Sequence, residues 1–139
     1  MRSVYFNGKF VPETEANISI YDSTLMFGDM IFDMTRSYNK KQFRLRKHLE
    51  RLYNSMKSAE ISIDMSIDEM EKACLDTIKK NEAFFEPHDE HRLMINVSRG
   101  PLSIYAEIFE GKLEPTITIA DFPLKWTVRG MDRLYEMGI

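Results

Sequence analysis

The segment 30–38 constrains the fold most strongly, because an extended chain here would place side chains of different character on its two faces. One face receives apolar and aromatic residues together with Arg36, whereas the other receives Asp33, Thr35 and Ser37. A guanidinium is costly to bury without a partner. The face that carries Arg36 is therefore expected either to be partly open or to hold an anion. A sheet-edge arginine that reaches water is the simpler alternative.

Hairpin and helix signals surround this strand. Asn7-Gly8 and Asn39-Lys40-Lys41 each lie between short strand-like runs and predict tight hairpin turns. Apolar residues at helical spacing predict a first helix over 46–61, and Ser66 with Glu69 forms a capping box that opens a second helix. The predicted elements are strands 4–6, 9–11 and 30–38, helices 46–61 and 66–81, and strands 91–99 and 116–121. This order predicts an α+β fold, an antiparallel sheet of about five or six strands with two helices packed on one face.

The composition is that of a single domain. The chain has 139 residues, of which 43% are hydrophobic and 29% charged, and its net charge is −3. This mild acidity argues against general nucleic-acid binding, and no apolar run approaches the ~20 residues that cross a membrane. Cys74 is the only cysteine. A single cysteine excludes an intrachain disulfide. Its position in a helical pattern predicts that it lies in the core. We expect a cytoplasmic protein.

A group of histidines and acids in the loop before residue 91 suggests a metal site at first sight. His88 and His91 lie close in sequence to Glu86, Asp89 and Glu90. Their spacing fits no recognised zinc pattern. We therefore expect a solvated loop and no metal.

Several short motifs, in this order, resemble the beginning of the class IV (fold type IV) pyridoxal-phosphate enzymes. They are Phe-Gly-Asp at 27–29, Ile-Phe-Asp at 31–33, Phe-Arg-Leu at 43–45, His-Leu-Glu-Arg-Leu at 48–52 and Ser-Arg-Gly at 98–100. The family includes branched-chain aminotransferases, D-amino-acid aminotransferases and 4-amino-4-deoxychorismate lyases. The resemblance covers nearly the whole chain. It implies pyridoxal 5'-phosphate as cofactor and an amino acid and a 2-oxo acid as substrates of the complete enzyme, and we do not expect this chain alone to hold the cofactor.

The resemblance also implies roles for individual side chains. Arg51 matches an arginine that contacts the cofactor phosphate. Helical geometry alone places it roughly 150° from the centre of the apolar stripe, which would make it a solvated surface residue. Both interpretations point Arg51 away from the core of its own domain. The residues implied on the substrate side are Phe27, Phe32, Arg36, Arg92 and Tyr105.

Among the members of the family, the branched-chain type is favoured, because the aromatic and arginine residues just named occupy the matching positions. Two departures are Met30, where a glycine is usual, and Leu93, where a proline is common. The D-amino-acid type carries an Arg-x-His pair in a loop that here reads Ser-Ile-Tyr-Ala at 103–106. The D-amino-acid type and the lyase remain alternatives.

The resemblance divides the chain into a small N-terminal domain (1–121), an interdomain linker (122–127) and the start of a large domain (128–139). In the family, the lysine that forms the Schiff base lies further along, on the large domain, and none of the ten lysines here matches it. We therefore expect no catalytic residue and no transaminase activity in this chain alone.

Three possibilities are left open for the chain as a whole. We favour a fragment, and the alternatives are half of a split enzyme or a free-standing binding and dimerisation module that reuses the fold. Phe122, Trp126 and Leu134 are expected to form an apolar surface that is covered in a homodimer.

Overall fold

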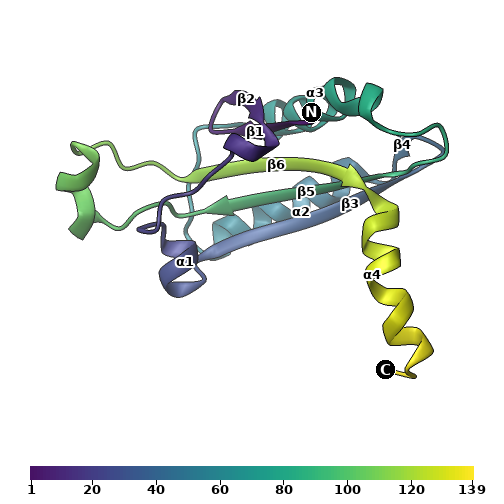
Figure 1. The fold of residues 1–139 in the computed structure, drawn as a ribbon. Coiled ribbons are helices and arrows are strands. Elements are labelled where there is room, and N and C mark those ends of the chain that lie inside the picture. The colour runs from purple at the N-terminus through teal and green to yellow at the C-terminus, as the bar shows by residue number, and fades with distance from the viewer.

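The computed structural model describes residues 1–139 and contains one antiparallel sheet of six strands, with the two longest sheet-packing helices on one face (Figure 1). This confirms the predicted α+β fold. The elements are β1 (Ser3–Phe6), β2 (Lys9–Pro12), the 3₁₀ helix η1 (Glu13–Glu15), α1 (Ser23–Phe27), β3 (Met30–Tyr38), β4 (Lys41–Gln42), α2 (Leu45–Ser58), α3 (Ile67–Asn81), η2 (Glu82–Phe84), β5 (His91–Ser98), η3 (Ser103–Phe109), β6 (Thr116–Pro123) and α4 (Leu124–Glu136).

The strands lie in the order β2-β1-β6-β5-β3-β4, and both predicted hairpins are confirmed. Asn7 and Gly8 have φ of 44° and 88°, and Asn39 and Lys40 have φ of 52° and 67°. Positive φ at both central residues is what a type I′ turn requires. Because β4 pairs only with the last two residues of β3, most of the outer edge of β3 has no neighbouring strand.

The two faces of the sheet have different environments. Helix α2 packs against β3, and α3 packs against β1 and β6. On this covered face Asp33, Thr35 and Ser37 of β3 are buried, as are Leu93, Ile95 and Val97 of β5. On the opposite face no helix covers the middle of β3, and Phe32 is 61% exposed. The face that carries Arg36 is therefore partly open, which is one of the expected alternatives.

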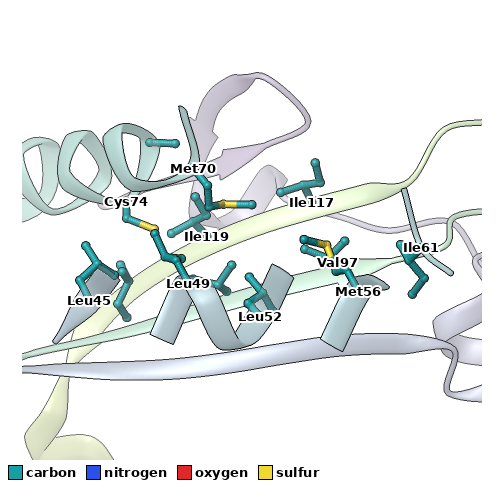
Figure 2. Packing of buried hydrophobic residues seen from close by; sticks show 13 residues of the cluster. Leu45, Leu49, Leu52, Met56, Ile61, Met70, Cys74, Val97, Ile117 and Ile119 are labelled. Atoms are coloured by element: carbon teal, nitrogen blue, oxygen red, sulfur yellow. The ribbon is translucent and has the colours of Figure 1, made fainter. Parts of the chain in front are cut away.

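The core lies between α2, α3 and the covered face of the sheet (Figure 2). The predicted stripe of α2 supplies Leu49, Leu52 and Met56, and α3 supplies Met70 and Cys74. Burial raises the pKa of the Cys74 thiol to about 12, which leaves it protonated and unreactive at neutral pH. The capping box at the start of α3 is confirmed.

Helix α2 ends at Ser58 rather than at the predicted residue 61. Glu60 adopts a left-handed conformation with φ of 56°, and the N–H of Ile61 donates to the carbonyl of Met56 at 2.9 Å. This closure returns Ile61 to the core, where it is 5% exposed. The apolar pattern extends to residue 61 although the helix does not, because a turn brings the Ile61 side chain back to the same core.

The predicted linker at 122–127 has regular secondary structure. Strand β6 continues through Pro123 and α4 begins directly at Leu124. Helix α4 extends away from the sheet, and none of its residues is buried (Figure 1). Trp126 and Leu134 are 48% and 40% exposed, and Phe122 stacks on Trp126. That these residues separate two domains stays a prediction. No helix has both the length and the apolar composition to cross a membrane.

A buried histidine joins β5 to its surroundings at the root of α4. The Nδ1 of His91 lies 2.8 Å from the Asp121 carboxylate of β6, and its Nε2 lies 2.7 Å from the Glu82 carboxylate of η2. The His91 side chain is fully buried. Burial opposes its charged form, but the hydrogen bonds and charges of Asp121 and Glu82 outweigh burial and raise the pKa of His91.

This bridge predicts a specific pH dependence of stability. Because the folded-state pKa of His91 is raised, the protonated bridge contributes fully below the ordinary value of about 6.5 and is lost as the pH rises through the folded-state value. Denaturant unfolding between about pH 6 and about pH 9 should show the stability difference between wild type and His91→Gln shrinking with rising pH. A difference that stays constant or grows would contradict the charged bridge.

Candidate functional site

Two arginines lie side by side on the open face without a carboxylate partner. Arg36 of β3 pairs directly with Arg92 of β5. The guanidinium of Arg36 lies 3.8 Å from the centre of the Tyr38 ring, and its Nε donates to the carbonyl of Ser37 at 3.1 Å. The Nε of Arg92 is buried and has no hydrogen-bond partner. Like charges directly opposite each other destabilise a sheet unless an anion lies between them.

Apolar side chains continue this open face along the strands. Directly beyond the arginine pair, Met34 of β3 is paired with Met94 of β5, and Phe32 is paired with Asn96. On the other side of Arg92, its cross-strand neighbour on β6 is Phe122. The face therefore presents two cations next to thioether and aromatic surface, a chemistry that suits a carboxylate with an aliphatic tail.

Arg51 of α2 lies beside the edge of β3 and is held by a buried acid. The Asp33 carboxylate accepts from Arg51 Nε at 2.9 Å and from Arg51 Nη2 at 2.7 Å. The Arg51 side chain is nevertheless 67% exposed, so the prediction that it points away from the core is confirmed. Its hydrogen bonds to Asp33 raise the pKa of Arg51.

His48, one helical turn before Arg51, completes this cluster. Its Nδ1 lies 2.9 Å from Asp33, and the backbone N–H of Met34 donates to the same carboxylate at 2.8 Å. Burial alone would raise the pKa of Asp33, but the hydrogen bonds and charges of Arg51 and His48 lower it. Asp33 is therefore ionised at neutral pH. Sequence reasoning missed Asp33, although its place on the buried face of β3 marked it as a carboxylate that needs partners.

A shallow hollow of about 530 Å³ lies next to Arg51. It is lined by Ile31, Arg51, Asn54, Ser55, Ser58 and Ala59. A guanidinium, an amide and hydroxyls are groups that donate hydrogen bonds to phosphate oxygens. The donor set at this edge of the sheet therefore fits the phosphate of the implied cofactor. That Arg51 binds it stays a prediction.

The other predicted residues lie further along the molecule. Phe32 shares the open face with the arginine pair, whereas Phe27 lies on α1, where it is 67% exposed. Tyr105 lies on η3, beyond the opposite end of β5 from Arg92, and its ring packs 5.0 Å from that of Tyr21. The structure thus places Arg36 and Arg92 opposite each other on neighbouring strands and leaves Phe27 and Tyr105 at the far end.

A second hollow, missed at the sequence level, lies near α1 at that far end. It has a volume of about 220 Å³ and is lined by Ile18, Asp22, Thr24, Met30, Asn96, Ser98, Thr116 and Thr118. Asp22 is 1% exposed and accepts from the hydroxyls of Ser98 at 3.0 Å and Thr116 at 2.6 Å. Alternation along the strand places Asn96 and Ser98 on the same face as Arg92, which is the sequence signal that points to this polar region.

The Ser-Arg-Gly motif at 98–100 has a structural role in this chain. Arg99 Nε donates to Asp29 at 2.5 Å, and its Nη atoms donate to the carbonyls of Ala59 and Glu60 at the end of α2. Gly100 has φ of 80°, and a Cβ there would lie 2.0 Å from the Glu114 carbonyl oxygen. The motif therefore fixes the start of β3, the end of α2 and the end of β5 to one another.

No group of three or more histidine, cysteine, aspartate or glutamate side chains is arranged to hold a metal ion. His91 is committed to its bridge with Asp121 and Glu82.

Comparisons with known proteins agree on one family. The family model described as amino-transferase class IV matches residues 30–135. A putative branched-chain-amino-acid aminotransferase of Methanocaldococcus jannaschii is 41% identical over 78 residues, 56% of this chain and 27% of that protein. The D-alanine aminotransferase of Bacillus licheniformis is 33% identical over 122 residues, 88% of this chain and 41% of that protein.

A solved structure shares the fold. It is the branched-chain amino acid aminotransferase of Thermoproteus uzoniensis with norvaline, with a TM-score of 0.71 and 25% identity over 88% of this chain and 40% of that chain. The chain thus spans less than half the length of each of these three proteins.

Because Arg92 has no acidic partner and Arg99 has several contacts, replacing each of them by methionine should affect stability differently. Arg92→Met removes one of two facing cations and should stabilise the fold, or leave it unchanged within about 0.5 kcal/mol. Arg99→Met removes contacts to Asp29 and to two helix-end carbonyls and should cost about 1 kcal/mol or more. Urea unfolding of both variants provides the measurement. Equal destabilisation by Arg92→Met would mean that Arg92 is a structural residue.

Proposed function

This chain belongs to the class IV aminotransferase family, and we propose on that basis that it supplies the cofactor-phosphate and substrate contacts of a pyridoxal-phosphate-dependent aminotransferase. The main support for this proposal is that Arg36 and Arg92 lie opposite each other on an open, partly apolar sheet face and have no carboxylate partner. Branched-chain amino acids and their 2-oxo acids are the proposed substrates. The branched-chain relative of M. jannaschii, at 41% identity, supports that substrate class.

The substrate contacts follow from the chemistry of the open face. A planar guanidinium matches a carboxylate through two parallel hydrogen bonds, so Arg36 and Arg92 would bind and orient the carboxylate. Phe32, Met34 and Met94 would accept the aliphatic side chain and exclude water from it. Phe27 and Tyr105 are the proposed contributors from the α1 end of the molecule, where movement of η3 would be needed to bring Tyr105 closer.

Arg51 is the proposed ligand of the cofactor phosphate. Its exposed guanidinium and the hollow beside Asn54 and Ser55 offer donors at the edge of β3. A further branched-chain aminotransferase structure of the same fold holds N-(5'-phosphopyridoxyl)-L-glutamate, which supports this cofactor. When bound, pyridoxal 5'-phosphate supplies the carbonyl that accepts the amino group and a ring that withdraws electrons. The residues of this chain hold the phosphate and orient the substrate next to it.

The tethering lysine of the family has no match among the ten lysines of this sequence. We propose that this chain supplies phosphate and carboxylate contacts to the complete enzyme and transfers no amino group by itself. Helix α4 exposes Trp126, Val128 and Leu134, and this apolar surface supports the proposal of a homodimer. A cytoplasmic location completes the proposal, since the single free thiol suits a reducing compartment.

The second candidate is a D-amino-acid aminotransferase. The D-alanine aminotransferase of B. licheniformis matches 88% of this chain, a larger share than the 56% matched by the branched-chain relative. Against it, residues 103–106 lack the Arg-x-His pair of that type. The two candidates differ in the size of the side chain that the open face must accept.

Arg51→Ala tests the cofactor site. Loss of a charge-assisted contact should weaken binding of pyridoxal 5'-phosphate by about tenfold to a hundredfold, measured by calorimetry on the full chain. Lys57→Ala, which removes a positive charge from the last turn of the same helix, should leave the affinity unchanged. An Arg51→Ala variant that binds as tightly as wild type would show that the phosphate lies elsewhere.

The substrate class is tested by comparing two 2-oxo acids. Since 4-methyl-2-oxopentanoate buries three more carbons than pyruvate, it should bind roughly tenfold more tightly or better. The double variant Arg36→Met with Arg92→Met should lose both ligands. Pyruvate binding as tightly as the branched acid would favour the D-alanine type, and retention of both ligands by the double variant would refute the carboxylate site.

A further inference from the structure

We infer that Asp33 is a positioning residue that fixes the guanidinium of Arg51 in the orientation that receives a phosphate. The inference rests on the phosphate role proposed above for Arg51. It concerns a residue on the covered face of the sheet that would touch neither cofactor nor substrate. Its evidence is the set of hydrogen bonds that converge on one carboxylate.

Asp33 is itself immobilised. Its side chain is 3% exposed, and the N–H of Met34, the ring of His48 and the fork of Arg51 all reach its two oxygens. A buried carboxylate whose acceptor positions are filled in this way has one orientation, because any rotation would leave charge unsatisfied. Asp33 therefore provides a fixed reference point for the more exposed arginine.

Asp33 binds one edge of the Arg51 guanidinium, and this determines which N–H donors remain for a ligand. Asp33 accepts from the Nε and Nη2 atoms along the side of the group, Nη2 also lies 3.4 Å from the Nδ1 of His48, and no protein atom accepts from Nη1. A guanidinium has five N–H donors, so the two hydrogens at the Nη1 end stay available. That end can take two oxygens of one phosphate while Asp33 keeps its hold. The hollow lined by Asn54 and Ser55 lies next to the same side chain.

An exposed arginine without such support would behave differently. Free arginine side chains sample many rotamers, and ordering one of them on a ligand costs binding free energy. Simple surface ion pairs between exposed groups do little to prevent this. Here the acid is buried and bidentate, so it holds the guanidinium in one orientation before a ligand arrives. Partners that orient metal-binding side chains typically change metal affinity by about tenfold to a hundredfold when they are replaced, and we expect an effect near the lower end of this range here.

The competing explanation is that Asp33 merely neutralises Arg51 and competes with the phosphate. The two explanations predict opposite signs for Asp33→Asn. If Asp33 competes, its neutralisation frees a cation and phosphate binds more tightly. If Asp33 positions the fork, phosphate binds more weakly even though the net charge becomes more favourable to an anion. Glu50→Gln makes the same change of charge one residue away from Arg51, in a side chain that pairs with Lys47.

The experiment measures the affinity of the full chain for inorganic phosphate and for pyridoxal 5'-phosphate, with pyridoxal as the ligand that lacks the phosphate. We expect Asp33→Asn to weaken both phosphate ligands about tenfold, Asp33→Glu to recover part of that loss, and Glu50→Gln to change nothing or tighten binding slightly. Pyridoxal should bind all these variants alike. Thermal unfolding identifies a variant that is not folded.

If Asp33→Asn does not fold, His48→Gln takes its place, because it removes one contact to Asp33 from a side chain that is 25% exposed. A threefold or larger loss of phosphate affinity supports positioning, and an unchanged affinity overturns it. Tighter phosphate binding by Asp33→Asn, together with a loss in Arg51→Ala, overturns the role of Asp33 but leaves that of Arg51 intact. Unchanged binding by Arg51→Ala overturns the phosphate role of Arg51 and this inference with it.

Discussion

The alternation of side chains along β3 is the constraint on which the rest of the structure depends. Its inward residues Asp33, Thr35 and Ser37 lie under α2, and its outward residues include Phe32 and Arg36 on a face that no helix covers. A shift of one residue in the pairing of β3 with β5 would exchange the two sets. Such a shift would bury Arg36 and expose Asp33, so the covered core and the ligand face are specified by the same register.

The arginines of this chain divide into two groups by what they contact. Arg99 is fully engaged with Asp29 and with carbonyls at the end of α2, and it joins elements of the fold. Arg36 and Arg92 face each other without an acid, and Arg51 keeps one end of its guanidinium free. Arg36 and Arg92 contribute little to stability, since their charges have no acidic partner until a ligand binds, whereas Arg51 neutralises the buried Asp33 and still keeps donors for a ligand. The proposed function rests on Arg36 and Arg92 on the open face and on Arg51, which extends from α2 on the covered side of β3.

Much of this arrangement follows from sequence periods, and the rest does not. The period of two along β3 predicted which face each residue occupies, and the helical period predicted that Arg51 leaves the core. The contact of Asp33 with His48 and Arg51 could not be predicted, because it depends on how α2 docks across β3. The same holds for His91 with Asp121, and for Tyr105, whose position is set by packing of η3 on Tyr21 rather than by any period.

The central claim is that the open face is preformed to bind a carboxylate between two facing arginines. Side-chain NMR of the arginine Nε–H groups during titration with a branched 2-oxo acid tests this claim most directly. The account predicts that the resonances of Arg36 and Arg92 shift together and saturate at one ligand concentration, while that of Arg99 stays in place. Shifts confined to Arg99 or spread evenly over exposed arginines, with Arg36 and Arg92 unaffected, would contradict it.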